Sequence, residues 1–463
     1  MEYRHAGPMR SFLLTACLGL LAFPIHGEQT RDLSEIYELA LARDPILQAA
    51  ANRLRASEEL IPQARALFLP ELSLEADANR NWETIDGTPA FGDVDAPGAS
   101  DEQSLSYNSW TAGLALTQPL FRMESFALRD QANIVLDQSA LQYAQAQQDL
   151  LLRVSEAYFD VLLAQDQVST LEAEQRAIDT ELRRAQRALD VGTGTVTDVN
   201  EAQARFDLVE AQILRARNNR TIAGENLRRL IDEQPGTLAG LRDEFVAEPP
   251  MPTDPGAWAE RAERHNINVR LAEREFERAR EEIRVQRAGH YPRVDLVARH
   301  GRSYQSDSPQ FDGSVDSETT SVGIRLQMPL FAGGSTSSQV RQAQAERDAF
   351  FDDTVDARRQ AALQAESAYL NLTANQQQIR ALEQALRSIR STEESTRRGV
   401  EVGLRTTLDL LNVQRDRFET ERELAEARYE YLLNYLRLQV AVGSGIDGSS
   451  IDDVNFFLSG NDG

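Results

Sequence analysis

One long sequence pattern occurs twice in this chain, and the second copy lies about 211 positions after the first. The clearest match is a glycine turn, because Val191-Gly192 in the first half corresponds to Val402-Gly403 in the second. Other matches pair Pro119-Leu120-Phe121 with Pro329-Leu330-Phe331, Glu156-Ala157-Tyr158 with Ser367-Ala368-Tyr369, and Thr197-Asp198 with Leu408-Asp409. Two copies of one long unit indicate a pseudo-symmetric molecule. We expect a first repeat at residues 28–245, a second at 246–443 and a C-terminal tail at 444–463.

Each repeat contains a long segment that is nearly free of proline and glycine, from Met123 to Asp190 and from Ser338 to Arg398. Apolar residues recur in both with the 3-4 spacing of a coiled-coil seam, as in Val168, Leu171, Ile178, Leu182 and in Ile379, Leu382, Leu386, Ile389. At 1.5 Å per residue, each helix would be on the order of 100 Å long. A glycine turn ends each helix and a second patterned segment follows, so we predict a long antiparallel helical hairpin in each repeat.

Shorter helical stretches precede these hairpins, at Leu33–Leu67 and Pro255–Ala288. Between the short and the long helices the apolar period changes from 3.6 to 2, which predicts four strands with one apolar and one polar face. The strands begin near Leu72, Trp110, Val294 and Val322. Their connections, Asn81–Tyr107 and Tyr304–Thr319, are rich in Gly, Asp, Ser and Pro, so we expect exposed loops there.

The apolar strand face needs a cover, and no other segment of the chain looks free to provide one. A half-buried sheet in a soluble protein is the ordinary interpretation of such strands. Four strands cannot close a barrel, because about eight are the practical minimum. Open sheet edges are not tolerated in lipid. The sequence therefore favours a membrane barrel to which several chains contribute four strands each.

The N-terminus has the pattern of a secretory signal at residues 1–27. Arg4 and Arg10 precede an apolar stretch from Phe12 to Phe23, and Gly27 is a small residue suited to cleavage. Cys17, the one cysteine, excludes disulfides within the chain. It also lies in a lipoprotein-like box, Leu14-Thr15-Ala16-Cys17, although the apolar run continues beyond it, so lipidation stays open.

The composition and the motifs exclude several functional classes. A net charge of −24 argues against nucleic acid as a partner. The five histidines are scattered, and the sequence contains no metalloprotease helix motif, nucleophile elbow or phosphate-binding loop. We therefore expect no enzyme activity, no metal site and no cofactor.

The chain resembles the TolC family of outer-membrane efflux and secretion channels over about residues 30–443. The resemblance is carried by the Pro-Leu-Phe strand exits, by Val191-Gly192 and Thr197-Asp198, and above all by the run from Val402 to Asn412. It implies an α+β membrane protein that is a homotrimer, with 12 strands in one outer-membrane β-barrel and 12 helices in a periplasmic α-barrel. A periplasmic adaptor and an inner-membrane pump would complete the conduit. Drug efflux and type I protein secretion stay open as alternatives.

The resemblance also assigns roles to residues of this sequence. Adaptor docking would use the helical tips, at Gly192 and Thr193 and at Gly403 and Leu404, beyond the helix-ending role that such glycines have in any case. Arg405 would hold the closed gate by bonding to Thr197-Asp198 of a neighbouring tip, while Val400 stands where the family has a second, tyrosine latch. Arg405 is otherwise a solvated tip charge, and Asp409 an acidic residue at a helix start.

Asp409 would form a selectivity ring of three carboxylates in a trimer, and Asn412 replaces the second acidic position, which suggests weaker cation selectivity. From the strand pattern we expect Trp110, Leu114, Leu116, Ile324 and Leu326 to face lipid, and Glu75, Asp77, Arg299 and Arg325 to face water. The competing hypothesis is a secreted coiled-coil scaffold or adhesin without a pore, which would not need the four alternating strands.

Overall fold

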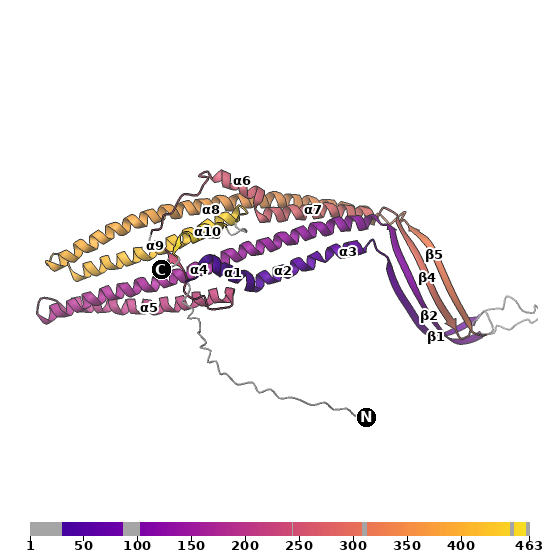
Figure 1. Cartoon of the computed structure of the whole chain (residues 1–463), viewed down its shortest axis with the longest axis horizontal. Helices are drawn as coiled ribbons and strands as arrows, with labels where there is room; N and C mark the ends of the chain where they lie inside the picture. Colours follow the sequence, from indigo (N-terminus) through magenta and orange to yellow (C-terminus); the bar gives the residue numbers. More distant parts are fainter. Residues whose placement is uncertain (1–29, 87–101, 243, 308–312, 445–448, 460–463) are drawn as a thin grey trace, which may run out of the picture.

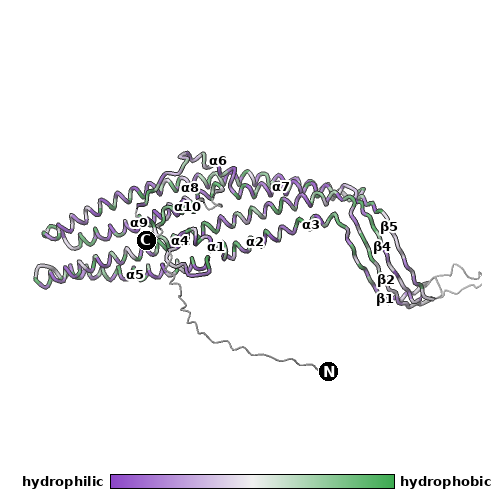
Figure 2. Tube along the Cα trace, in the orientation of Figure 1, coloured by the Kyte–Doolittle hydropathy of each residue, from purple (hydrophilic) through white to green (hydrophobic). Residues whose placement is uncertain are grey.

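The chain forms a long rod of helices that ends in a bent four-stranded sheet (Figure 1). The structure is a computed structural model, and it describes residues 30–86, 102–242, 244–307, 313–444 and 449–459. The expected signal segment at 1–27 and Cys17 lie outside the described residues. Figure 2 shows hydrophobic and hydrophilic residues interleaved along the helices, as expected for helices that bury only one stripe.

The first repeat contains the first of the two hairpins. Its elements are α1 (Leu33–Arg43), α2 (Pro45–Glu58), α3 (Leu60–Ala66), β1 (Glu71–Asp86), β2 (Glu102–Phe121), α4 (Met123–Asp190) and α5 (Val196–Ile231). The predicted bounds of the first long helix are those of α4. The predicted stretch Leu33–Leu67 is interrupted, because the Asp44 side chain caps α2 by accepting from the Leu47 N–H and Pro45 occupies its first turn.

After a short strand at the end of the first repeat, the second repeat follows a similar order, with two short helices where the first repeat has three. The elements are β3 (Gly240–Leu241), α6 (Pro255–His265), α7 (Ile267–Ala288), β4 (Arg293–Gln305), β5 (Val315–Gln327), α8 (Ser335–Glu401) and α9 (Thr407–Ala441), followed by α10 (Ser449–Asn455) and β6 (Leu458–Ser459). The long helix α8 extends three residues beyond its predicted bounds at each end. Asn266 interrupts the predicted stretch Pro255–Ala288, because its side chain caps α7. The short β6 pairs with β3, so the C-terminal segment packs against the end of the first repeat.

The apolar core lies in the middle of the rod, where α1, α4, α5, α6, α8, α9 and α10 contribute buried side chains. Two repeat-equivalent tyrosines attach the long helices to the segments that cross them. The Tyr158 hydroxyl donates to the Ala239 carbonyl at 2.8 Å, and the Tyr369 hydroxyl donates to the Thr253 carbonyl at 2.5 Å. A second apolar cluster runs along the α4–α5 seam and includes Ile178, Leu182 and Val209. This seam is the one that the 3-4 spacing predicts.

The four strands form one antiparallel sheet in the order β1-β2-β4-β5. The sheet is longer than the sequence indicates, so the expected loops at Asn81–Tyr107 and Tyr304–Thr319 are partly wrong. Between β1 and β2 the pairing continues from Asn81 opposite Tyr107 as far as Asp86 opposite Glu102. Between β4 and β5 it continues as far as Gln305 opposite Val315. Antiparallel pairing satisfies the backbone whatever the side chains are, so polar composition alone does not end a ladder.

Candidate functional site

The two helical tips have the same backbone, which positions their exposed residues in equivalent ways. Gly192 and Gly403 adopt positive φ angles of 78° and 74°, a conformation that glycine adopts without strain. Behind each glycine, the next residue's N–H closes the turn: Thr193 donates to the Ala188 carbonyl at 2.9 Å, and Leu404 donates to the Gly399 carbonyl at 2.8 Å. The tips differ in their outermost side chain, because Leu404 is 82% exposed where the first tip presents a threonine.

The tips also differ in which side of one close contact carries the glycine. In the first tip it is the residue after the turn, and in the second it is the residue in the preceding helix. In the first tip, Gly194 lies against Ala188, and a methyl group on Gly194 would come 2.9 Å from the Ala188 Cβ. At the equivalent positions of the second tip stand Arg405 and Gly399. A Cβ on Gly399 would come 2.7 Å from the Arg405 Cγ, so the stem of Arg405 crosses the helix only because residue 399 is glycine. Gly399 was not among the predicted site residues, although the exchange is visible when the two repeats are compared position by position.

Capping boxes fix Asp198 and Asp409 at the starts of the returning helices. Asp198 accepts from the Thr195 N–H at 3.2 Å, and Asp409 accepts from the Thr406 N–H at 3.0 Å, while each threonine hydroxyl accepts the aspartate N–H in return. The Thr406 backbone N–H and side chain lower the pKa of Asp409, and the Arg405 charge adds to this effect. Asp409 is therefore held ionised in a fixed orientation, as a ring of carboxylates would need.

The other predicted gate residues lie apart within one chain. Among the described residues, no hydrogen bond or ion pair joins Arg405 to Thr197 or Asp198. Asn412 lies instead at the contact between the two hairpins, where its side-chain oxygen accepts from Arg205 at 3.5 Å. Close by, Arg184 of α4 pairs with Glu401 of α8 at 3.2 Å.

The apolar strand residues share one face of the sheet. Opposite residues of an antiparallel pair point to the same side, and the register places Leu74 opposite Leu114, Leu72 opposite Leu116, and Leu296 opposite Ile324. Trp110 and Tyr304 stack at 6.3 Å on this face, further from the helices. The opposite face presents the polar residues Glu75, Asp77 and Arg299. The face that contains Leu114 and Ile324 is thus suited to lipid, with the aromatic pair towards the strand tips.

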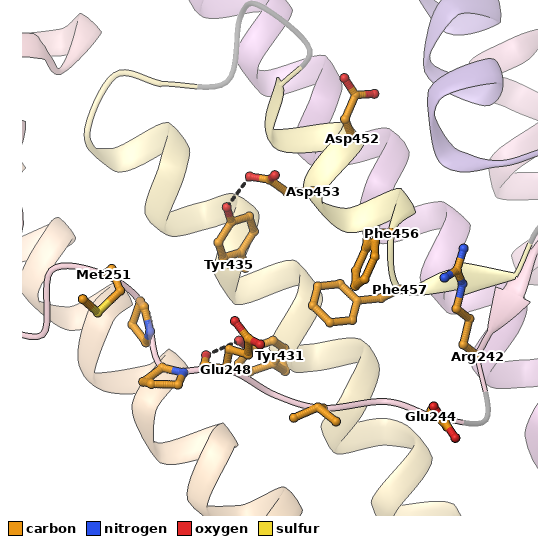
Figure 3. Close-up of a pocket in the computed structure, with 13 residues that line it drawn as sticks. Arg242, Glu244, Glu248, Met251, Tyr431, Tyr435, Asp452, Asp453, Phe456 and Phe457 are labelled. Atoms are coloured by element: carbon orange, nitrogen blue, oxygen red, sulfur yellow. Dashed lines mark hydrogen bonds between the residues drawn. The ribbon is translucent and has the colours of Figure 1, made fainter.

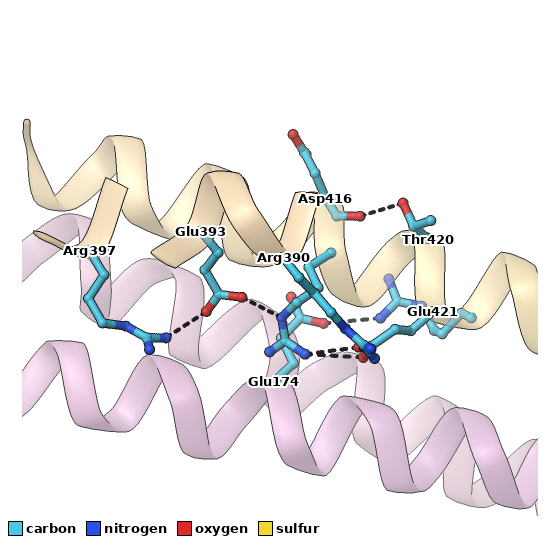
Figure 4. Close-up of polar contacts among 9 residues, drawn as sticks. Glu174, Arg390, Glu393, Arg397, Asp416, Thr420 and Glu421 are labelled. Carbon is cyan, nitrogen blue, oxygen red and sulfur yellow. Dashed lines mark hydrogen bonds and ion pairs between the residues drawn. The ribbon is translucent and has the colours of Figure 1, made fainter. Parts of the chain in front are cut away.

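Above the tips, a cluster of charged side chains closes the second hairpin, and one of its ion pairs reaches the first hairpin (Figure 4). Glu174 of α4 pairs with Arg422 of α9 at 3.1 Å, and Glu393 of α8 lies 2.6 Å from the Nε of Arg417. Arg397 also pairs with Glu393, and Arg390 with Glu421. Burial raises the pKa of Glu174, while the Arg422 charge opposes the shift. We call the residues Glu174, Arg390, Glu393, Arg397, Arg417, Glu421 and Arg422 the charged seam.

The charged seam replaces apolar residues of the other repeat. Glu393 and Arg417 stand at the positions of Leu182 and Phe206, which belong to the apolar cluster between α4 and α5. The two hairpins therefore have the same backbone arrangement, but apolar packing holds the helices of the first together and ion pairs hold those of the second together. None of the described helices is both long and apolar enough to cross a bilayer.

Comparison with known proteins gives a consistent result. The sequence model of the family described as outer membrane efflux protein matches residues 36–233 and 258–444. The chain belongs to this family. It is 33% identical over 409 residues to the alkaline protease secretion protein AprF of Pseudomonas aeruginosa, covering 88% of this chain and 83% of that protein. It is 31% identical over 443 residues to the outer membrane protein TolC of Vibrio cholerae, covering 96% of each.

Solved structures support the same fold for this outer membrane efflux protein. The outer membrane protein VceC of Vibrio cholerae matches with a TM-score of 0.71 and 20% identity, over 89% of this chain and 96% of that chain. The expected α+β architecture of helical hairpins and a four-stranded sheet is confirmed. The protein is an outer-membrane exit duct for efflux or type I secretion, with a large periplasmic part, and its family is one of transport proteins rather than enzymes. The scaffold or adhesin hypothesis is wrong.

Proposed function

We propose that three copies of this chain form the duct, each contributing four strands to a 12-stranded barrel and two hairpins to a tunnel. The observation that carries the proposal is the open sheet. Its outer strands β1 and β5 each have a free edge in the described chain, and its Leu114 face is apolar. Open edges in lipid leave backbone groups unpaired, whereas closing three sheets edge to edge pairs all of them.

The trimer also supplies the partners that a single chain lacks. Arg405 then bonds to Thr197-Asp198 of the neighbouring tip and closes the gate, because a guanidinium suits a carboxylate and hydroxyl target. Three copies of Asp409 form a ring that favours cations. The exposed tips at Thr193 and Leu404 dock a periplasmic adaptor, which links the duct to an inner-membrane pump. Each copy consists of the first repeat at 28–245, the second repeat at 246–443 and the C-terminal tail at 444–463.

The mass of the purified protein in detergent tests the proposal directly. We expect three copies per particle and, in planar bilayers, a small conductance that reflects a closed gate. The particle should migrate in gels as a heat-modifiable species from the outer-membrane fraction. A stable monomer that conducts ions would contradict the shared barrel, and a trimer that does not partition into membranes would contradict the lipid-facing assignment.

A further inference from the structure

A pocket of about 790 Å³ lies beside α9, away from the helical tips and from the sheet (Figure 3). Tyr431 and Tyr435 of α9 form its floor. One wall is the extended segment between β3 and α6, which includes Val246 and Met251. The other wall is Phe456 with its neighbours at the end of α10. None of the gate, ring or strand residues described above lines it.

Phe245 and Ala247 anchor the extended wall in the apolar core, and three of its carbonyl groups accept side-chain hydrogen bonds. Gln376 donates to the Ala247 carbonyl at 2.8 Å, Tyr431 donates to the Glu248 carbonyl at 2.6 Å, and the Trp258 indole donates to the Pro252 carbonyl at 2.7 Å. Within the described residues, the N–H groups of Val246 and Glu248, the exposed residues on either side of buried Ala247, donate no hydrogen bond. A firmly held extended segment with free N–H groups can bind the backbone of another extended chain.

The pocket presents large apolar side chains to solvent. Met251 is 75% exposed, Phe456 68% and Val246 65%. Phe456 is held in place, because its ring lies against Phe457 at 5.6 Å and under the Arg242 guanidinium at 5.3 Å. Rigid exposed apolar groups gathered around a cavity mark an interaction surface better than single exposed residues do.

The charge around the pocket is strongly negative. Glu244, Glu248, Asp452 and Asp453 line it, against the single cation Arg242. Arg242 also donates to the Leu458 carbonyl at 3.0 Å, and Asp453 accepts from the Tyr435 hydroxyl at 2.6 Å. In the described chain none of these four carboxylates has an ion-pair partner, so they favour a cationic ligand.

We propose that this pocket binds an extended segment of a periplasmic partner protein in which basic and apolar residues alternate. The apolar residues enter between Met251 and Phe456, and the basic residues face the carboxylates of Glu248 and Asp452. The peptide carbonyls accept from the free N–H groups of the extended wall. This contact lies away from the tips and adds a second attachment point to the duct.

A synthetic peptide tests the proposal on the purified full-length protein in nanodiscs. The probe is a fluorescein-labelled hexapeptide with Arg at positions 2 and 4 and Leu at positions 3 and 5, followed by fluorescence anisotropy. We expect binding to weaken by about tenfold or more in Asp452→Asn/Asp453→Asn and in Met251→Ser/Phe456→Ser. The exposed acidic pair of α8 provides a matched control, because Asp352→Asn/Asp353→Asn removes the same charge elsewhere and should leave binding unchanged.

Three results would overturn the proposal. Equal binding to all variants, or to a probe with Glu in place of Arg, would show that the pocket does not select a basic segment. A Phe456→Cys variant that maleimide cannot label in the assembled protein would show that other copies cover the pocket. A change in particle mass in Met251→Ser/Phe456→Ser would make the pocket a contact between copies.

Discussion

Adding a single methyl group at Gly399 tests the proposed gate role of Arg405. In Gly399→Ala the new Cβ would meet the stem of Arg405, so the guanidinium must move away from its place across the turn. We expect higher single-channel conductance in planar bilayers, in the same direction as Arg405→Ser. The helix itself gains up to about 1 kcal/mol from replacing glycine, so thermal stability should not fall. A Gly399→Ala duct that conducts like wild type would show that Arg405 is not the latch.

The effect of the Asp409 charge can be separated from the residue's helix-capping role, because the first repeat has the same capping box. Asp409→Asn keeps an oxygen for the Thr406 N–H but removes the proposed ring charge. We expect reduced cation preference, measured as a smaller reversal potential in a salt gradient, and weaker block by multivalent cations. Asp198→Asn changes the equivalent cap and also weakens the proposed contact with Arg405, so it should raise the conductance but leave the reversal potential unchanged. If both variants shift it equally, the effect comes from the tip structure and not from a ring.

At the residue scale, the sequence predicts residues that a local backbone conformation requires. It does not predict contacts between side chains that lie apart in the sequence. The turn glycines Gly192 and Gly403 are predictable, because a positive φ after a helix selects glycine. Gly399 is not, because inside a helix pattern it reads only as a weak helix former. Its contact with Arg405 exists only once the turn has folded the chain back. The family resemblance placed Asn412 beside the proposed selectivity ring, but its bond to Arg205 joins residues of different repeats and was not predicted.

The sheet faces give a prediction for the strands. Leu114→Arg and Ile324→Arg place a charge on the apolar face, which we expect to cost roughly 2–4 kcal/mol near the bilayer midplane and to reduce assembled trimer in the outer membrane. Ala115→Arg and Ser321→Arg are the controls, because Ala115 is adjacent to Leu114, Ser321 lies three residues before Ile324, and both point to the other face. Heat-modifiable gel migration measures assembly. Equal loss in all four variants would mean that bulk, rather than lipid contact, is responsible.

The charged seam gives a prediction that depends on pH. Arg422→Leu leaves Glu174, which is 3% exposed, without its partner, and should cost about 3 kcal/mol at neutral pH. Burial already raises the pKa of Glu174, so the folded state binds a proton more readily than the unfolded state. The penalty is therefore full above the folded pKa and should shrink as the pH falls through it. Thermal unfolding at several pH values from 8 to 5 or so, followed by circular dichroism, measures this.

An exposed pair of the first hairpin controls that experiment. Arg217 and Glu172 pair at 2.7 Å on the surface, so Arg217→Leu should cause no measurable change in melting temperature at any of these pH values. A penalty in Arg422→Leu that stays constant with pH would show that the lost packing of the arginine stem, and not the charge of Glu174, is responsible.

At the element scale, the helices were predictable where one period continues without interruption, as in α4. The breaks at Asp44 and Asn266 were not, because capping residues inside a helical pattern resemble ordinary polar surface positions. The strand ends were missed for a related reason. Polar residues beyond Asn81 match a loop in composition, but the register set by Leu72 and Leu74 continues the ladder through them.

For the whole molecule, the repeat and the four-strand count were enough to predict the helical hairpins and the four-stranded sheet of one chain. Neither depends on detailed packing. The charged seam could not be predicted, because Glu393 and Arg417 look like solvent-facing residues in a coiled-coil pattern, and only the approach of α9 to α4 and α8 buries them. The pocket beside α10 was equally hidden, since it joins segments from residues 242–251 and 452–457 that lie far apart in the sequence.

The unequal closure of the two hairpins makes the duct entrance sensitive to the ionic strength around it. Dissolved salt screens charges, and the outer cations of the charged seam, Arg390 and Arg397, are open to solvent. The apolar seam around Leu182 has no charge to screen, and strongly hydrated salts such as sulfate reinforce it. High salt therefore weakens the contacts that close the α8–α9 hairpin. It leaves the contacts of the α4–α5 hairpin unchanged or strengthens them. In the proposed trimer, salt-sensitive and salt-resistant hairpins then alternate around the entrance of the duct, and the ionic strength of the medium sets the difference between them.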